Sequence, residues 1–260
     1  MNIQQYYQKS AVIALNASLI ALIPPFILAI YGIIIMHNRL LILTIIPFLA
    51  YSIVCYHCYL INESRSKEIT EQIRNGEQTR KLLQIDDVMI AFLPAPSLRM
   101  IIFEKDGKQV GEVKDLKNWT IRWYLPYFLD NLLKRNYGVY DETNRLIAIY
   151  TFKKNRIEVM RLDCKQIINI DIYRNHHAET VFTYDQSILT VKQSALFMDY
   201  QIFRELQMIS RVRKGWLPVE WGKRFKDPNT PILSFEKELT DEERLVLLAI
   251  ISERFRYSNH

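Results

Sequence analysis

Cysteine and glycine are scarce in this chain. Among its 260 residues there are three Cys and seven Gly. Three thiols cannot supply the several disulfides that hold small secreted scaffolds together, so that class of protein is excluded. With so few glycines, a glycine-rich loop that cradles a phosphate group is not expected. Hydrophobic residues make up 49% of the chain, which also excludes a disordered or low-complexity protein.

Charge is almost missing from the first 62 residues, where only Lys9 and Arg39 carry it. The uncharged segments 10–38 and 40–62 are each longer than the roughly 20 residues that a helix needs to cross about 30 Å of hydrocarbon. A signal peptide would have a shorter apolar run. Two amphipathic core helices would each show a polar face. We therefore predict a transmembrane helical hairpin over residues 1–62.

Prolines and basic residues refine this hairpin. Pro24-Pro25 and Pro47 are expected to kink the helices, because proline removes a backbone donor. Basic residues gather just after the second span, at Arg65, Lys67, Arg74, Arg80 and Lys81. Since basic residues beside a membrane mark its cytoplasmic side, both termini are predicted to be cytoplasmic. The Ile- and Lys-rich composition is typical of a low-GC bacterium, for which the membrane would be the plasma membrane.

Residues 63–84 are polar and carry charges of both signs. We expect a juxtamembrane stalk that continues the second helix to about Asn75-Gly76, with Gly76 as its end.

From residue 85 to residue 260 the pattern is that of a β-rich domain. About a dozen short runs rich in Ile, Val, Tyr, Phe and Thr alternate with turn signals, which predicts a closed barrel or a sandwich. Asp86-Asp87 are interpreted as loop residues, and one internal helix is expected over 126–135. The predicted strands are 97–105, 109–114, 119–124, 137–140, 146–153, 156–162, 167–173, 180–184, 187–192, 197–204, 207–213, 219–225 and 232–235.

The C-terminal segment predicts a buried helix. Thr240 and Glu243 form a capping box, and seven consecutive apolar residues follow from Leu245 to Ile251. A helix that is apolar on all sides must be enclosed, and this one is too short to span a bilayer. We expect it to thread the barrel, with packing between two domains or subunits as the alternative. The fold class is thus a membrane-anchored α+β protein: a two-helix hairpin, then a mostly antiparallel closed barrel of about twelve strands around a hydrophobic C-terminal helix.

The region from Ile85 to Phe255 resembles the tubby C-terminal-like superfamily, which includes the LURP-one-related proteins and the phospholipid scramblases. The resemblance rests on the tail PILSFEKELTDEERLVLLAIISERF (231–255) and on the hairpins QVGEVKDL (109–116) and YGVYDETNRLIAIYTF (137–152). It implies a twelve-stranded barrel around a helix. In eukaryotic tubby proteins the domain binds phosphoinositide headgroups, but no motif here carries those residues over. The N-terminal hairpin departs from the scramblase arrangement.

Motifs for catalysis, metal or cofactors are not found, so no enzyme, metal site or cofactor is predicted. The chain has no phosphate-binding glycine loop, GxSxG elbow or HExxH motif. His176-His177 fall in a predicted turn, Cys55 and Cys58 in a predicted span, and Cys164 is a lone thiol.

Basic residues near aromatic ones are the candidate site. Such pairs suit an anionic membrane surface, because aromatic rings settle at headgroup level while Lys and Arg contact phosphates. A further basic cluster, Lys153, Lys154 and Arg156, falls at a hairpin tip, and Phe225 is expected to be exposed. The candidate contacts are Arg211, Arg213, Lys214, Trp221, Lys223, Arg224 and Lys226. The alternative is that these charges only solvate the barrel.

The sequence therefore predicts a non-enzymatic, membrane-anchored protein whose barrel engages the inner membrane face or a membrane partner, as a sensor, an adaptor or an immunity-like protector. Membrane lipids, anionic headgroups and a membrane protein are the expected partners, and nucleic acid is not. The alternatives are a scramblase-like activity that moves lipids and a regulatory subunit of a membrane complex.

Overall fold

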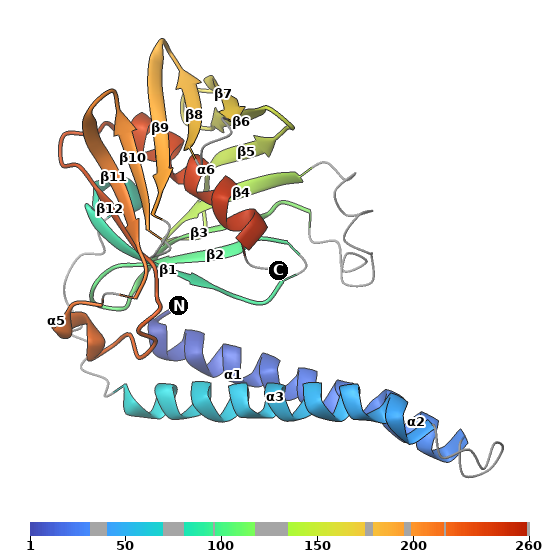
Figure 1. Cartoon of the computed structure of the whole chain (residues 1–260). Helices are drawn as coiled ribbons and strands as arrows, with labels where there is room; N and C mark the ends of the chain where they lie inside the picture. Colours follow the sequence, from blue (N-terminus) through green and yellow to red (C-terminus); the bar gives the residue numbers. More distant parts are fainter. Residues whose placement is uncertain are drawn as a thin grey trace. The chain divides into compact units, whose positions relative to one another are not determined.

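The computed structural model describes residues 1–31, 41–69, 81–95, 97–117, 135–174, 179–194, 199–215 and 217–258. The chain divides into two compact units, Met1–Ile73 and Arg74–His260. Figure 1 shows the helices of the first unit and the barrel of the second.

The first unit is a pair of packed, apolar helical segments. Its helices are α1 (Ile3–Ala21), α2 (Ile23–Tyr31) and α3 (Leu41–Glu68). Two stretches, Ile3–Tyr31 and Leu43–Glu68, are long and apolar enough to cross a membrane by length and composition. The first stretch is interrupted at Leu22, and Pro24-Pro25 lie in the first turn of α2. Proline suits the first turn of a helix but cannot continue a preceding one. Pro47 lies inside α3 without ending it.

Small polar side chains join α1 to α3. The hydroxyls of Ser18 and Ser52 lie 3.0 Å apart, and the Ser52 hydroxyl is also placed to donate to the Ser18 carbonyl. Both side chains are buried, so each would be left without a partner if the helices separated. α3 runs on past residue 62 to Glu68, as expected for the start of the stalk. The expected end at Asn75-Gly76 lies outside the described residues.

The second unit is a closed antiparallel barrel of twelve strands, which confirms the predicted fold class. Every strand pairs with its neighbours in sequence, and β1 closes the barrel on β12. The strands are β1 (Asp87–Phe92), β2 (Arg99–Phe103), β3 (Gln109–Asp115), β4 (Arg135–Asp141), β5 (Leu146–Phe152), β6 (Arg156–Arg161), β7 (Ile167–Arg174), β8 (Glu179–Tyr184), β9 (Ser187–Gln193), β10 (Tyr200–Arg204), β11 (Gln207–Arg213) and β12 (Ile232–Phe235).

Two predictions for individual strands were wrong. Asp87 is not a loop residue but begins β1, whose four central residues are all buried. A strand buried on both faces lacks the alternation that identifies a half-exposed one. Residues 219–225 are not a strand, because a short helix, α5 (Val219–Gly222), begins after Pro218. The predicted strand 119–124 lies outside the described residues, and so does the predicted helix 126–135 except for Arg135, which begins β4.

The C-terminal helix α6 (Asp241–Ser258) lies inside the barrel, as predicted (Figure 1). Its first turn is capped as expected: the Thr240 backbone N–H donates to Glu243 at 2.8 Å, and the Glu243 N–H donates to the Thr240 hydroxyl at 3.3 Å. Residues 245–251 are at most 2% exposed and belong to one core with the inward side chains of the strands. The buried Tyr150 hydroxyl donates to the Leu245 carbonyl at 2.9 Å and ties the helix to β5.

The topology separates the barrel into two ends. Since neighbouring strands are antiparallel and consecutive, successive connections alternate between the ends. The chain enters β1 and leaves β12 at the same end, where α6 starts and where the short 3-10 helix η2 (Leu82–Gln84) precedes β1; we call this the N-end. The other end, where Phe255 near the end of α6 packs on Phe92 at the end of β1, we call the C-end.

Candidate functional site

An outer face of the barrel is covered by the chain between β11 and β12. By the strand register, Arg213, Ile232, Met89 and Phe103 lie side by side on β11, β12, β1 and β2. They point outward, because the residues next to them on each strand belong to the inner core. Ile232, Met89 and Phe103 are nevertheless fully buried. Part of their cover is Phe225, whose ring packs edge-on against Phe103 with 6.2 Å between centroids.

We call residues 214–231 the outer connection. It leaves β11 after Arg213, forms α5, and returns into β12, with the described part running over 214–215 and 217–231. Phe225 is 1% exposed, so the expectation of an exposed aromatic ring there was wrong. The reason is that this ring is needed against Phe103. Trp221, by contrast, is half-buried on α5.

The outward side of α5 combines an apolar and a basic surface. Val219 on α5 is 89% exposed. Lys223 is exposed and Arg224 is half-buried directly after the helix. Within the described part of the chain, neither Lys223 nor Arg224 has an ion pair. The outer connection thus presents an exposed aliphatic side chain near two cations without an ion pair, and the exposed Glu220 lies beside Val219 on α5.

The end of β11 carries basic residues that are less available. Arg211 points outward, but its Nε donates to both carboxylate oxygens of Asp199 at 3.1 and 3.0 Å. Asp199 is buried, and its hydrogen bonds raise the pKa of the Arg211 guanidinium. Arg213 is half-buried at the strand end. Lys214 and Lys226 are half-buried and both interact with neighbouring groups.

The seven predicted contact residues therefore lie in β11 or in the outer connection that follows it. They differ in how available their charge is to an anionic ligand. Asp199 forms an ion pair with Arg211, whereas Lys223 and Arg224 have no ion pair among the described residues. The hairpin cluster is largely compensated too: Lys153 pairs with Glu158, and Arg156 donates to Asp171 at 2.7 Å.

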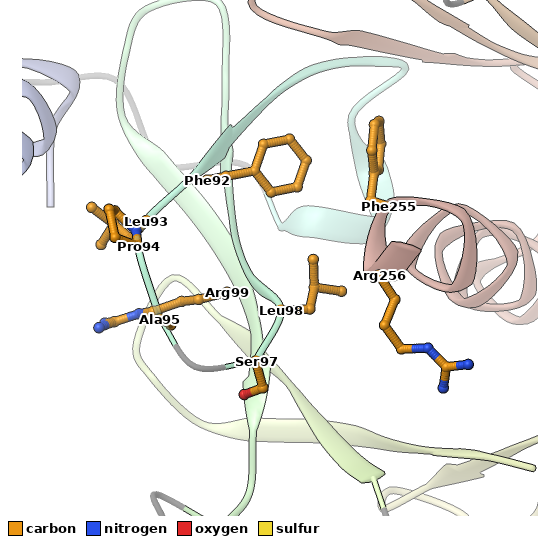
Figure 2. Close-up of a pocket in the computed structure, with 9 residues that line it drawn as sticks. All are labelled: Phe92, Leu93, Pro94, Ala95, Ser97, Leu98, Arg99, Phe255 and Arg256. Atoms are coloured by element: carbon orange, nitrogen blue, oxygen red, sulfur yellow. The ribbon is translucent and has the colours of Figure 1, made fainter. Parts of the chain in front are cut away.

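A cavity at the C-end was not predicted from the sequence. It has a volume of about 320 Å³ and lies between the β1–β2 connection and the last turns of α6 (Figure 2). Its walls come from segments far apart in the chain, so no local motif could have revealed it. The lining residues are Phe92, Leu93, Pro94, Ala95, Ser97, Leu98, Arg99, Phe255 and Arg256.

Metal-ligand groupings are not present among the described residues: no three His, Cys, Asp or Glu side chains there could hold an ion together. His176 and His177 lie outside the described residues. Cys55 and Cys58 lie on α3, and Cys164 is exposed in the turn between β6 and β7.

Comparison with known proteins does not identify a family for this chain. No protein-family model and no curated protein matches the chain. A solved X-ray structure of a protein from Arabidopsis thaliana is similar over 65% of this chain and 91% of that one, with 10% identity and a TM-score of 0.41. A TM-score of this size is too low to assign a fold or a function.

Proposed function

We propose that this protein is a non-enzymatic membrane-anchored adaptor whose barrel rests on the anionic inner face of the membrane through the outer connection. The observation that carries the proposal is the exposed Val219 on α5 followed by Lys223 and Arg224, which come directly after the helix and have no ion pair among the described residues. An aliphatic side chain next to cations matches the boundary between headgroups and acyl chains, where apolar atoms insert and cations contact phosphates.

The proposed anchor is the pair of apolar segments in the first unit. A helix in the core of a soluble protein is mostly buried, whereas only 17% and 6% of the most apolar windows of these segments are buried. Large side chains such as Phe26, Leu43 and Ile53 are 61–69% exposed. Burying them in hydrocarbon would remove this apolar surface from water.

The proposed orientation puts both termini and the barrel in the cytoplasm, because Arg65 and Lys67 lie at the C-terminal end of the second segment, in the last turn of α3. Cys164 provides a native probe, since it is exposed on the barrel. With Cys55 and Cys58 replaced by serine, a membrane-impermeant maleimide should label Cys164 only after cells are permeabilised. Labelling of Cys164 in intact cells would show that the barrel lies outside the cytoplasm and would contradict the proposed orientation.

Hydrogen exchange can test the contact itself in the full-length protein. We expect the backbone amides of residues 217–227 to exchange roughly thirtyfold more slowly in nanodiscs that contain anionic lipid than in purely zwitterionic ones, since Lys223 and Arg224 near such a surface contribute about 1 kcal/mol each. High salt should remove most of the difference, because it screens exposed charges.

A matched pair of variants separates a local contact from a general charge effect. Lys223→Glu with Arg224→Glu should abolish the protection. Lys165→Glu with Lys237→Glu makes the same change of charge in exposed turns at the N-end, and should leave the protection intact. Equal exchange in both lipid compositions, or equal losses in both variants, would refute the proposed surface.

We further propose that the barrel belongs to the tubby C-terminal-like superfamily. What supports this is the tail at 231–255 together with an architecture of twelve antiparallel strands around a C-terminal helix. The proposal does not transfer any ligand-binding residue from that group. Family models rebuilt from closer relatives of this chain would test it, and their failure to join the superfamily would count against it.

A further inference from the structure

We infer that the cavity at the C-end is a binding site for a single-chain anionic amphiphile, namely a medium-chain fatty acid carboxylate or the matching part of a longer one. This inference concerns a different site from the outer connection and does not depend on the proposed membrane contact. It rests on the cavity's shape, its apolar floor and its unbalanced charge.

The floor of the cavity is apolar and well packed. The rings of Phe92 and Phe255 meet edge-on with 4.9 Å between centroids, and Leu98 lies beside them (Figure 2). Leu93 and Leu98 are 4% and 6% exposed, so their side chains are held in place by the fold. An alkyl chain placed here would replace water on aromatic and aliphatic surfaces, which is favourable.

The described residues of the β1–β2 connection, 93–95 and 97–98, form one wall of the cavity. The Leu93 N–H donates to the Arg99 carbonyl at 3.1 Å and closes the connection at its base. Pro94 adds a fixed φ within it. A site that is formed before its ligand arrives avoids much of the entropy cost of ordering a loop on binding.

The charge around the cavity is positive. Two of the described lining residues are arginines and none is acidic. The Nε of Arg99 donates to Glu112 at 2.7 Å, but Glu112 also accepts from Lys114 at 3.1 Å. One carboxylate thus balances two cations, and an excess positive charge remains beside the mouth of the cavity.

The second arginine, Arg256, is 9% exposed in the last turn of α6. Its guanidinium carbon lies 5.0 Å from the centroid of the Phe152 ring, in a cation–π contact. Figure 2 shows Arg99 and Arg256 on different sides of Leu98, so one ligand carboxylate meets only one of them. We assign it to Arg99.

The orientation of the ligand follows from exposure. The Arg99 side chain is 32% exposed, whereas Phe255 and Leu98 are buried. Among the described contacts, Glu112 takes only the Nε of Arg99, which leaves the two terminal nitrogens for a carboxylate. Charge-assisted bonds of this type are among the stronger hydrogen bonds in proteins. The carboxylate therefore lies at the mouth and the chain runs inward.

The volume sets the size of the ligand. A water molecule occupies about 30 Å³ of liquid, so the cavity holds about ten non-hydrogen atoms. A decanoate is slightly larger than this limit and can leave its end at the opening. An inorganic anion would leave the apolar floor in contact with water, and an uncharged chain would not use the arginines.

Photocrosslinking tests the inference in the full-length protein in zwitterionic nanodiscs. A ten-carbon fatty acid with a diazirine on its chain should form adducts in residues 92–99 and 253–256, besides any in the apolar helices. Excess decanoate should compete for the barrel adducts, while decanol and inorganic phosphate should not. Equal competition by decanol would refute the anion site, and competition by phosphate would indicate a site for free anions or headgroups instead.

Two variants test the two halves of the site separately. Leu98→Trp fills the cavity, and Arg99→Gln removes the cation; each should lower the barrel adducts at least about tenfold. Leu206→Trp is the control for the first, because Leu206 is 96% exposed in the β10–β11 turn. Near-ultraviolet circular dichroism verifies that each variant is folded. If Leu98→Trp does not fold, Arg99→Gln alone tests the inference. The inference would be wrong if Arg99→Gln formed as many barrel adducts as the wild type.

Discussion

Replacing Arg244 by alanine should loosen the junction between α6 and the start of the barrel. Arg244 lies in the first turn of α6, and its side chain is only 5% exposed. One terminal nitrogen donates to the Ile85 carbonyl at 2.6 Å and the other to Asp86 at 2.7 Å. The guanidinium also lies over the Phe235 ring, at 5.3 Å from its centroid. A single side chain thus connects the enclosed helix to the residues that enter β1 and to the end of β12.

The magnitude follows from how buried each partner is. A hydrogen bond from a charged donor to a carbonyl contributes about 1.5–3 kcal/mol, and breaking it leaves the carbonyl of the buried Ile85 without this donor. The Asp86 side chain is 41% exposed, so its ion pair should contribute at most about 1 kcal/mol. We therefore expect Arg244→Ala to cost about 2–4 kcal/mol of unfolding free energy, and Asp86→Asn less than about 1 kcal/mol.

Thermal unfolding of the full-length protein in mild detergent measures both. Near-ultraviolet circular dichroism reports the packed rings of the barrel, including the fully buried Tyr137 and Tyr150. For a domain of this size about 2–4 kcal/mol corresponds to a fall in melting temperature of roughly 4–16 °C. Arg244→Lys should fall between the two variants, since an ammonium cannot donate to both acceptors in the same geometry.

The comparison between variants is what makes the reasoning refutable. If Asp86→Asn destabilises the barrel as much as Arg244→Ala, the exposed ion pair rather than the buried carbonyl carries the energy. If Arg244→Ala melts at the wild-type temperature, α6 is held by its apolar core alone and the argument from its first turn is wrong.

Two further predictions concern packing and pH. Gly111→Ala would place a Cβ atom 2.7 Å from a Leu82 methyl carbon and 3.0 Å from the Tyr140 carbonyl oxygen. We therefore expect it to lower the unfolding free energy, measured by chemical denaturation, by about 1–3 kcal/mol. The control Gly222→Ala has 3.9 Å to its nearest neighbour and should leave the unfolding free energy unchanged. Burial would raise the pKa of Glu243, but hydrogen bonds from Thr240 and Arg204 outweigh it and lower the pKa below the ordinary 4.5. The ionised Glu243 therefore stabilises the fold above pH 4.5, and this contribution is lost as the pH falls through its lower folded pKa. Melting temperatures of wild type and Glu243→Gln should differ at pH 7 and converge toward pH 3; a constant gap would contradict the assignment.

Much of the architecture could be predicted from local patterns. The scarcity of charge before residue 63 predicted two long apolar helices, because segments 10–38 and 40–62 contain no charged side chain, and the structure has helices there. The seven apolar residues from Leu245 indicate an enclosed helix, since such a segment has no face to show to water. Alternation identified most of the strands because one side of each faces solvent.

Predictions failed where a segment is covered on both sides. The central residues of β1 face the core on one side and are buried on the other, so they do not alternate. In residues 219–225, aromatic and aliphatic residues at spacing two resemble a strand. Pro218 instead begins a helical turn, and Phe225 folds back onto Phe103, a contact that depends on where β2 lies.

The candidate site shows the same division. The sequence by itself determined which residues carry charge, that they are concentrated after residue 62, and that basic and aromatic residues lie close together at 211–226. Only the tertiary structure decided which of those charges are compensated, because Arg211 meets Asp199 across a strand pair while Lys223 has no such partner among the described residues.

The cavity belongs entirely to the tertiary structure. Phe92 and Phe255 stand near opposite ends of the second unit's sequence, and nothing in either local segment indicates a site. They meet because the barrel closes through β1 and β12 and the helix that follows β12 returns through its centre. Composition and periodicity determine which helices and strands form, because their formation depends on neighbours along the chain. A cavity forms where side chains from distant segments leave space between them. Only the closed barrel determines which segments meet in this way.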